Sequence, residues 1–258
     1  NGKELRLNYI LPQETSFKAD LIIIATKFDG LADAVSNIKN FIKEDTIILS
    51  LLNGVTSEEI IASQYGWNHL LLSYFIGHSA MRNRNNITFD GVGDIVFGGK
   101  YKNDNDLKNI KLVKSYFDKV GINYKIPEDM FRALWLKFMM NVSSNQVSAI
   151  LGMTFGQMQK NLKARDLLKK VMKEVLSVAK VIGVNNTESM IDEAFCAFDN
   201  MISNGKTSML QDVEAKRKTE VDIFAGTMVK LGEKYSIPTP YNKFLKEIIE
   251  VIEQDYSK

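Results

Sequence analysis

Three polar side chains recur at four-residue spacing within a strongly apolar segment, namely Lys137, Asn141 and Asn145. Residues at i, i+4 and i+8 of an α-helix share one face. The other positions carry bulky apolar side chains, which are Trp135, Leu136, Phe138, Met139, Met140 and Val142. Because burying an unpaired polar group costs about 1–3 kcal/mol, the polar stripe is either a solvated strip or one wall of a polar cleft. In a cleft, the two amides would orient a small oxygen-rich substrate, and the lysine could give a proton to an oxygen that develops negative charge.

A second candidate is the dipeptide Asn53-Gly54, which follows directly after a β-branched apolar run at 46–52. Asn-Gly by itself is mostly turn chemistry, because both residues tolerate a positive φ. Its position at the end of a predicted strand also suits ligand binding, since open α/β sheets bind ligands at the carboxyl ends of their parallel strands. Lys27 stands at the corresponding end of the preceding predicted strand, where it is either a ligand contact or an ordinary surface lysine.

Ser208 is the third candidate, because it fits the N-cap of a long helix with Gln211 as its capping-box partner. Capping is compatible with ligand binding, since a helix N-terminus attracts a carboxylate or a phosphate. Glu220 follows twelve residues later, about 18 Å along the axis of the predicted helix. The two side chains therefore cannot both touch one small group of atoms, and spacing alone does not single out Glu220 among the charges nearby.

The elements that must position these residues differ between the two halves of the chain. Up to about residue 126, short apolar runs at 21–25 and 46–52 are typical of parallel strands that helices cover on both faces. A helical pattern at 30–43 lies between them and completes a βαβ unit. We expect a helix at 57–65, a strand at 69–76, a hairpin of strands at 87–90 and 94–98, and a helix at 107–120 that ends at Gly121.

From residue 127 onward the pattern is helical almost throughout. We expect helices at about 127–149, 160–182, 188–203, 208–235 and 241–255, separated by Gly183, Gly205 and the Pro238-Thr-Pro240 segment. The sequence therefore predicts the α/β class, with a parallel-sheet domain at 1–126 followed by an all-α domain at 127–258.

Composition excludes several classes of function. The chain has 33 Lys and Arg against 31 Asp and Glu, so its net charge of +2 provides no strong attraction to nucleic acid or to a membrane surface. A single cysteine, Cys196, rules out an internal disulfide framework. Two histidines, His69 and His78, are too few for a transition-metal cage, and we interpret His78 and Cys196 as structural. No apolar run approaches the ~18 residues of a membrane span, and we take a reducing cytoplasm as the default location.

The chain contains no G-x-G-x-x-G dinucleotide fingerprint. Its single G-x-G is Gly91-Val-Gly93, which lies within the predicted hairpin and lacks the third glycine. We therefore expect this segment to be a poor phosphate-binding loop.

In spite of that absence, the chain from about Ala19 onward resembles the ketopantoate reductases (2-dehydropantoate 2-reductases). This family has an N-terminal Rossmann domain and a C-terminal helical domain. The most specific feature is a lysine with asparagines at +4 and +8, followed by Ser-Met-Leu-Gln-Asp and then by Thr-Glu eleven and twelve residues after the serine. The matching pieces, in the order of the family, are Ala25-Thr-Lys27, Leu51-Leu-Asn-Gly-Val55, Trp135-Leu-Lys-Phe-Met-Met-Asn-Val-Ser-Ser-Asn145, Thr207-Ser-Met-Leu-Gln-Asp212 and Thr219-Glu220.

The resemblance implies an NADPH-dependent reduction of 2-dehydropantoate to pantoate in pantothenate biosynthesis. Lys137 would be the general acid that protonates the ketone oxygen as hydride arrives from NADPH. A free lysine titrates near about 10.4, so acid catalysis at neutral pH would need that pKa lowered by partial burial. The residues that would hold the 2-oxo acid are Asn141, Asn145 and Ser208, with Asn53 at the junction of substrate and nicotinamide.

The resemblance also implies which residues contact NADP. Lys27 would touch the cofactor, Asn53 would lie beside the nicotinamide, and Glu220 would reach the cofactor or the catalytic lysine when the domains close. The implied partner is a small 2-oxo acid, with no nucleic acid and no membrane, and the resemblance is compatible with a homodimer.

The sequence departs from the family pattern in two respects, which concern the cofactor and the substrate. The family begins with the fingerprint strand, glycine loop and helix, and this sequence starts after them, so we expect this chain to bind NADPH poorly or not at all. Leu52 and Gly30 stand where the family often has glutamine, and Phe155 stands near a position where some members have a substrate-contacting asparagine. Two alternatives therefore stay open: a D-2-hydroxyacid dehydrogenase acting on branched 2-oxo acids, and a non-catalytic module that has lost cofactor binding.

Overall fold

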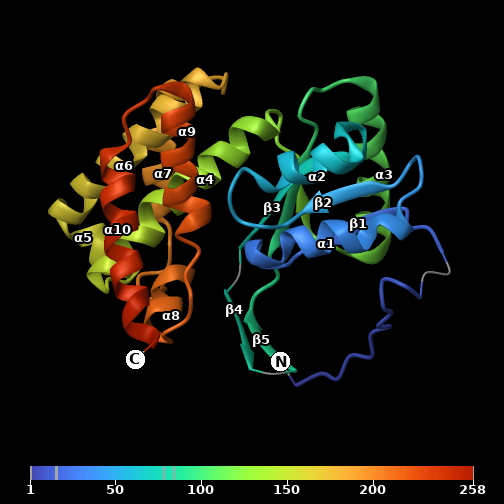
Figure 1. Cartoon of the computed structure of the whole chain (residues 1–258), viewed down its shortest axis with the longest axis horizontal. Coiled ribbons are helices and arrows are strands. Elements are labelled where there is room, and N and C mark those ends of the chain that lie inside the picture. Colours follow the sequence, from blue (N-terminus) through green and yellow to red (C-terminus); the bar gives the residue numbers. More distant parts are fainter. Residues whose placement is uncertain (1, 15–16, 78, 84, 258) are drawn as a thin grey trace. The chain divides into compact units, whose positions relative to one another are not determined.

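The computed structural model describes residues 2–14, 17–77, 79–83 and 85–257, so His78 lies outside the described residues. The chain divides into two compact units (Figure 1). The first comprises Asn1–Asn53 with Ser57–Phe131, and the second comprises Gly54–Thr56 with Arg132–Lys258. The sequence places its domain boundary at 126/127, and the roles given there to the two domains stay predictions.

The first unit is built on a five-stranded sheet in the order β1-β2-β3-β6-β7. Its strands are β1 (Leu21–Ile24), β2 (Ile47–Ser50), β3 (Leu70–Ile76), β6 (Asp94–Gly98) and β7 (Tyr124–Lys125). The first three strands are parallel to one another, β6 is antiparallel to β3, and β7 is parallel to β6. The predicted α/β class is thus confirmed, and the parallel pair predicted from the two apolar runs is β1 and β2.

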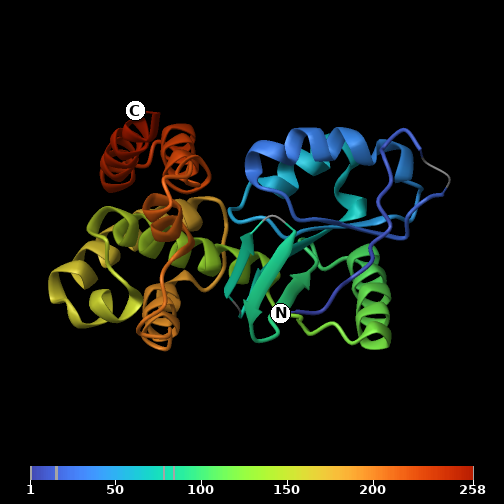
Figure 2. The same ribbon diagram turned by 90° about the horizontal axis from the view of Figure 1, so that it is seen from below.

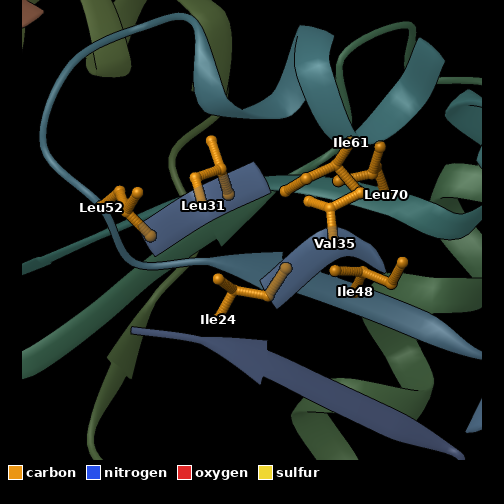
Figure 3. Close-up of a cluster of buried hydrophobic side chains, with 7 residues drawn as sticks. All are labelled: Ile24, Leu31, Val35, Ile48, Leu52, Ile61 and Leu70. Atoms are coloured by element: carbon orange, nitrogen blue, oxygen red, sulfur yellow. The ribbon is translucent and has the colours of Figure 1, made fainter. Parts of the chain in front are cut away.

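Helices cover both faces of this sheet, as Figure 2 shows for α1 and α2 (blue and cyan) on one side and α3 (green) on the other. Their bounds are α1 (Leu31–Asn37), α2 (Ser57–Tyr65) and α3 (Asp104–Val120). The cluster under α1 and α2 is drawn in Figure 3 and consists of Ile24, Leu31, Val35, Ile48, Leu52, Ile61 and Leu70. The cluster under α3 consists of Ile47, Leu49, Leu71, Ile95, Phe97, Val113 and Phe117. Adjacent strand residues pack on opposite faces because strand side chains alternate.

The predicted hairpin of strands at 87–90 and 94–98 is wrong. Strand β5 (Asn86–Asp90) pairs with β4 (Ser79–Asn83) in a separate two-stranded sheet, whereas β6 pairs with β3 in the main sheet. The chain between β5 and β6 passes so close to β3 that a Cβ on Gly93 would lie 2.4 Å from the carbonyl oxygen of Ile76. The glycines there permit a close approach of two backbones and do not form a hairpin turn.

The second unit is helical among the residues that the structure describes. Its main helices are α4 (Met130–Leu151), α5 (Phe155–Lys160), α6 (Leu162–Val181), α7 (Met190–Asp199), α8 (Ser208–Glu214), α9 (Thr227–Tyr235) and α10 (Pro240–Gln254). Cys196 on α7 is a free, exposed thiol. The helix predicted to begin near residue 160 starts at Leu162, because Asn161 is extended and its side-chain oxygen accepts the backbone N–H groups of Lys163 and Ala164.

The long helix predicted at 208–235 is also wrong. Helix α8 ends at Glu214, Lys216 adopts a left-handed backbone with φ of 51°, and a π-helical turn at Asp222–Gly226 leads into α9. The break is stabilised by Arg217, whose backbone N–H and side-chain Nε donate to the carbonyl and carboxylate of Asp212 at 2.8 Å each. The side chain of Asp212 is almost completely buried, so this pair directs the chain away from the helix axis.

Candidate active site

The polar stripe lies on α4, a helix that is apolar on most of its surface, as the four-residue spacing predicts. Phe138, Met139 and Val142 are fully buried. Asn141 and Asn145 are only 8% and 6% exposed, and Lys137 is half-buried. The two amides are therefore not part of a solvated strip, and the cleft wall stays a prediction.

Asn145 and Ser208, 63 residues apart, form a direct contact. The hydroxyl of Ser208 donates to Oδ1 of Asn145 at 3.0 Å, and the backbone N–H of Met209 donates to the same oxygen at 3.2 Å. Because two donors fix that oxygen, the Nδ2 amide of Asn145 keeps its two N–H donors for another acceptor. The structure thus brings together two residues that the sequence analysis names as substrate contacts.

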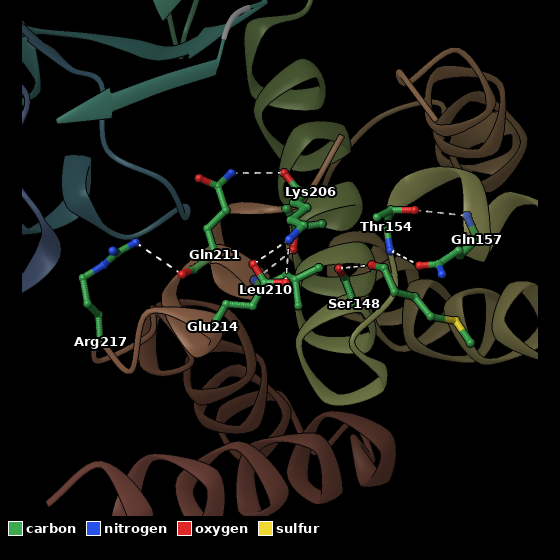
Figure 4. A network of polar contacts seen from close by, with 10 residues as sticks. Ser148, Thr154, Gln157, Lys206, Leu210, Gln211, Glu214 and Arg217 are labelled. Atoms are coloured by element: carbon green, nitrogen blue, oxygen red, sulfur yellow. Dashed lines mark hydrogen bonds and ion pairs between the residues drawn. The ribbon is translucent and has the colours of Figure 1, made fainter. Parts of the chain in front are cut away.

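The predicted capping role of Ser208 needs correction. Thr207 is the N-cap of α8, and its Oγ1 accepts the backbone N–H of Leu210 at 3.1 Å. Figure 4 shows the polar contacts around this turn, including the ion pair of Lys206 with Glu214 and the bond from Gln211 to the carbonyl of Lys206. Ser208 is the first residue of α8, so its hydroxyl is available to Asn145. At seven residues, α8 is too short to provide the anion-attracting helix terminus that the sequence analysis expects.

Lys137 is a half-buried lysine whose ammonium group is desolvated. Desolvation by the surrounding apolar side chains lowers the pKa of its ammonium group below the ordinary lysine value. Among the residues that the structure describes, no carboxylate forms an ion pair with Lys137 that would oppose this effect. A lysine with a lowered pKa transfers its proton more readily than a solvated one.

Lys27 and Asn53 belong to the first unit and lie at the same edge of its sheet. Lys27 follows β1 and Asn53 follows β2, and these strands are parallel neighbours. Lys27 is exposed and precedes a short 3-10 turn at Phe28–Gly30, whereas Asn53 is half-buried. Gly54 has a φ of 97°, which confirms the turn chemistry expected of Asn-Gly.

Glu220 lies outside any α-helix, because α8 ends before it. The side chain is half-buried, and its backbone carbonyl accepts the N–H groups of Ile223 and Phe224 at the start of the π-helical turn. The expected separation of Ser208 and Glu220 by about 18 Å along one helix is wrong, because the helix ends at Glu214.

A buried carboxyl group, which the sequence pattern does not reveal, lies in the first turn of α2. Glu58 is 2% exposed, and its Oε2 accepts the hydroxyl of Ser57 at 2.9 Å. Ser57 in turn accepts the hydroxyl of Ser50 at 2.8 Å, at the end of β2. Burial raises the pKa of Glu58 to about 7, against hydrogen bonds from Ser57 and from the backbone of Glu58 and Ser73 that lower it. A Ser-Glu pair at the start of a helix reads as ordinary capping, so the sequence contained no separate signal.

Two further features concern the described residues alone. They contain no group of three or more His, Cys, Asp or Glu side chains that could hold a metal ion. No helix within the described ranges is long and apolar enough to cross a membrane.

Comparison with known families gives matches over most of the chain. The profile described as "Ketopantoate reductase PanE/ApbA" matches residues 3–101, and the profile described as "Ketopantoate reductase PanE/ApbA C terminal" matches residues 129–253. The 2-dehydropantoate 2-reductase of Streptococcus pyogenes serotype M6 is 26% identical over 250 residues, which are 96% of this chain and 81% of that protein.

Solved structures also match the fold of this chain. A D-mandelate dehydrogenase bound to NADH and anilino(oxo)acetate has a TM-score of 0.88 and 25% identity, and the match covers all of this chain and 84% of that one. A dimeric ketopantoate reductase from Staphylococcus aureus has a TM-score of 0.78 and 20% identity, with 95% of this chain and 81% of that chain covered. Together with the two profile matches and the α/β sheet followed by helices, these likenesses show that the chain belongs to the ketopantoate reductase family.

Proposed function

We propose that this protein reduces 2-dehydropantoate to pantoate with NADPH as the reductant. The observation that carries the proposal is the stripe on α4, where the desolvated Lys137 shares a helix face with two buried amides and one of these is oriented by Ser208. A cation beside fixed amide donors suits a carbonyl oxygen that gains negative charge next to a carboxylate.

The residues at the sheet edge fit a nicotinamide dinucleotide. Lys27 provides an exposed cation at the carboxyl end of β1, which suits a phosphate group. Asn53 provides an amide at the end of the neighbouring strand, and Gly54 lets the backbone turn there without a side chain. When bound, NADPH supplies hydride to the carbonyl carbon of the substrate.

In this proposal Lys137 gives its proton to the carbonyl oxygen of the 2-oxo acid, which becomes the hydroxyl group of the product, and it takes up another proton from water. Asn141, Asn145 and Ser208 hold the carboxylate and hydroxyl groups of the substrate. Glu220 completes the site by contacting the cofactor or Lys137.

Two measurements test the proposal. NADPH is titrated calorimetrically into this chain and into a version preceded by the glycine-rich strand, loop and helix of a related reductase. We expect binding at least to the longer version, and absence of binding to both would favour the non-catalytic module instead. In the version that binds, Lys137→Ala should lower kcat by about 100-fold or more, and near-unchanged turnover would refute the acid role.

A second candidate function follows from the D-mandelate dehydrogenase, whose match covers the whole chain at a TM-score of 0.88. In this alternative the substrate is an aromatic or branched 2-oxo acid, which is reduced to a D-2-hydroxy acid. The values of kcat/KM for 2-dehydropantoate, phenylglyoxylate and a branched 2-oxo acid decide between the two, because each candidate function predicts a different preferred substrate.

We also propose a homodimer. The Staphylococcus aureus structure is described as dimeric, and that description motivates the proposal. Sedimentation equilibrium over a range of protein concentrations tests it, and a monomer at all concentrations would refute it.

A further inference from the structure

Glu220 lies in the segment 215–221, between the end of α8 and the π-helical turn. Residues of α8 and α10 hold this segment in place. At its start, Lys216 adopts a left-handed backbone, and Arg217 bonds to Asp212 through both its backbone and its side chain. Figure 4 shows a further contact there, from Nη2 of Arg217 to the carbonyl of Gln211. These contacts fix the point at which the chain leaves α8.

The end of the segment is held by Glu253, near the C-terminus of α10. Oε1 of Glu253 accepts the backbone N–H of Thr219 at 2.7 Å. The hydroxyl of Thr219 then accepts the N–H of Val221 at 3.2 Å. Thr219 and Val221 are 5% and 1% exposed, whereas Glu220 between them is half-buried. Both neighbours of Glu220 are thus buried and hydrogen-bonded, which fixes the backbone from which the Glu220 side chain projects.

A π-helical turn begins immediately after this segment. The N–H of Gly226 donates to the carbonyl of Val221 at 3.0 Å, five residues back, and Glu220 contributes the carbonyl that accepts Ile223 and Phe224. Such turns are uncommon and frequently occur at functional sites. The π-helical turn and the Glu253 bond meet on either side of Glu220, so the backbone there is constrained from both directions.

We propose that Glu253 is a positioning residue that acts on the reaction through Glu220. The inference rests on the proposed function, in which Glu220 contacts the cofactor or Lys137. A hydrogen bond from a backbone N–H to a carboxylate is short and strong, so Glu253 defines the backbone conformation from which Glu220 projects. Loss of this bond frees the Thr219–Val221 backbone and moves the Glu220 carboxylate away from its productive position.

Glu253→Ala and Glu253→Gln separate the hydrogen bond from the rest of the side chain. The alanine variant should increase amide hydrogen exchange at 218–221 and lower kcat by about 10-fold to 100-fold, the cost expected when a catalytic group is misplaced by about 1 Å. The glutamine variant keeps an acceptor oxygen and should retain kcat within about threefold. Glu247→Ala is the matched control, because Glu247 is an exposed glutamate on the same helix. Unchanged exchange in Glu253→Ala would overturn the inference without any activity measurement.

A double-mutant cycle shows whether Glu253 acts through Glu220. If it does, Glu253→Ala in a Glu220→Gln background lowers kcat no further than Glu220→Gln alone. An additional loss of the same size as in the wild type would overturn the inference. If Glu220→Gln itself keeps full turnover, the proposed role of Glu220 fails and the inference fails with it. If Glu220→Gln is impaired but Glu253→Ala is not, the inference alone fails.

Discussion

Replacing Glu58 by glutamine should change how the stability of the first unit depends on pH. The carboxyl group is buried, and its pKa rises from the ordinary value of 4.5 to about 7. A carboxyl group with a raised folded-state pKa binds its proton more tightly in the folded chain than in the unfolded chain. Its contribution to stability is therefore fully present below the unfolded pKa and is lost as the pH rises through about 7.

The size of the effect follows from the two pKa values. At about 1.4 kcal/mol for each pH unit between them, ionisation of Glu58 lowers the free energy of unfolding by about 3 kcal/mol between about pH 4 and about pH 8. Glutamine cannot ionise, and its amide oxygen can accept the bond from Ser57. Glu58→Gln should therefore gain about 3 kcal/mol relative to the wild type over that range.

Urea unfolding at a series of pH values measures this directly. The fluorescence of Trp67, read with Trp135 replaced by phenylalanine, reports on the first unit, because Trp67 packs against the same core cluster as α2. Glu59→Gln is the matched control, since Glu59 is the adjacent residue and is exposed. We expect the Glu59 variant to keep most of the wild-type pH dependence, because charge repulsion from Glu59 is a small contribution to the raised pKa of Glu58. Parallel pH dependences for the wild type and Glu58→Gln would refute the reasoning that burial keeps this carboxyl group protonated.

Three further predictions concern the site. Because desolvation lowers the pKa of Lys137, kcat should fall at alkaline pH with a midpoint below the ordinary lysine value, and a midpoint at that value would contradict the burial argument. Asn145→Ala leaves the buried N–H of Met209 without its acceptor, so urea unfolding should show a loss of about 1–3 kcal/mol together with a raised KM, and an unchanged KM would argue against substrate contact. Gly54→Ala should cost about 1–3 kcal/mol through its positive φ, while Gly121→Ala serves as a reference at another positive-φ glycine, where a Cβ would meet no neighbouring atom.

The sequence by itself determined the features that depend on a short stretch of chain. The apolar runs specify β1 and β2, because a strand covered on both faces needs continuous apolar side chains. The spacing of Lys137, Asn141 and Asn145 specifies one face of α4, because helix geometry repeats within a few residues. Gly121 ends α3 in a left-handed conformation for the same local reason.

Only the tertiary structure decided which distant segments meet. Nothing local specifies that β6 pairs with β3 instead of β5, since all three segments have strand character. The break after Glu214 depends on burial of the Asp212 carboxylate beside Arg217, and a window of helix-forming residues does not reveal it. The bond between Asn145 and Ser208 joins residues 63 positions apart. The raised pKa of Glu58 comes from desolvation, which depends on every element packed around the carboxyl group and is therefore a property of the fold.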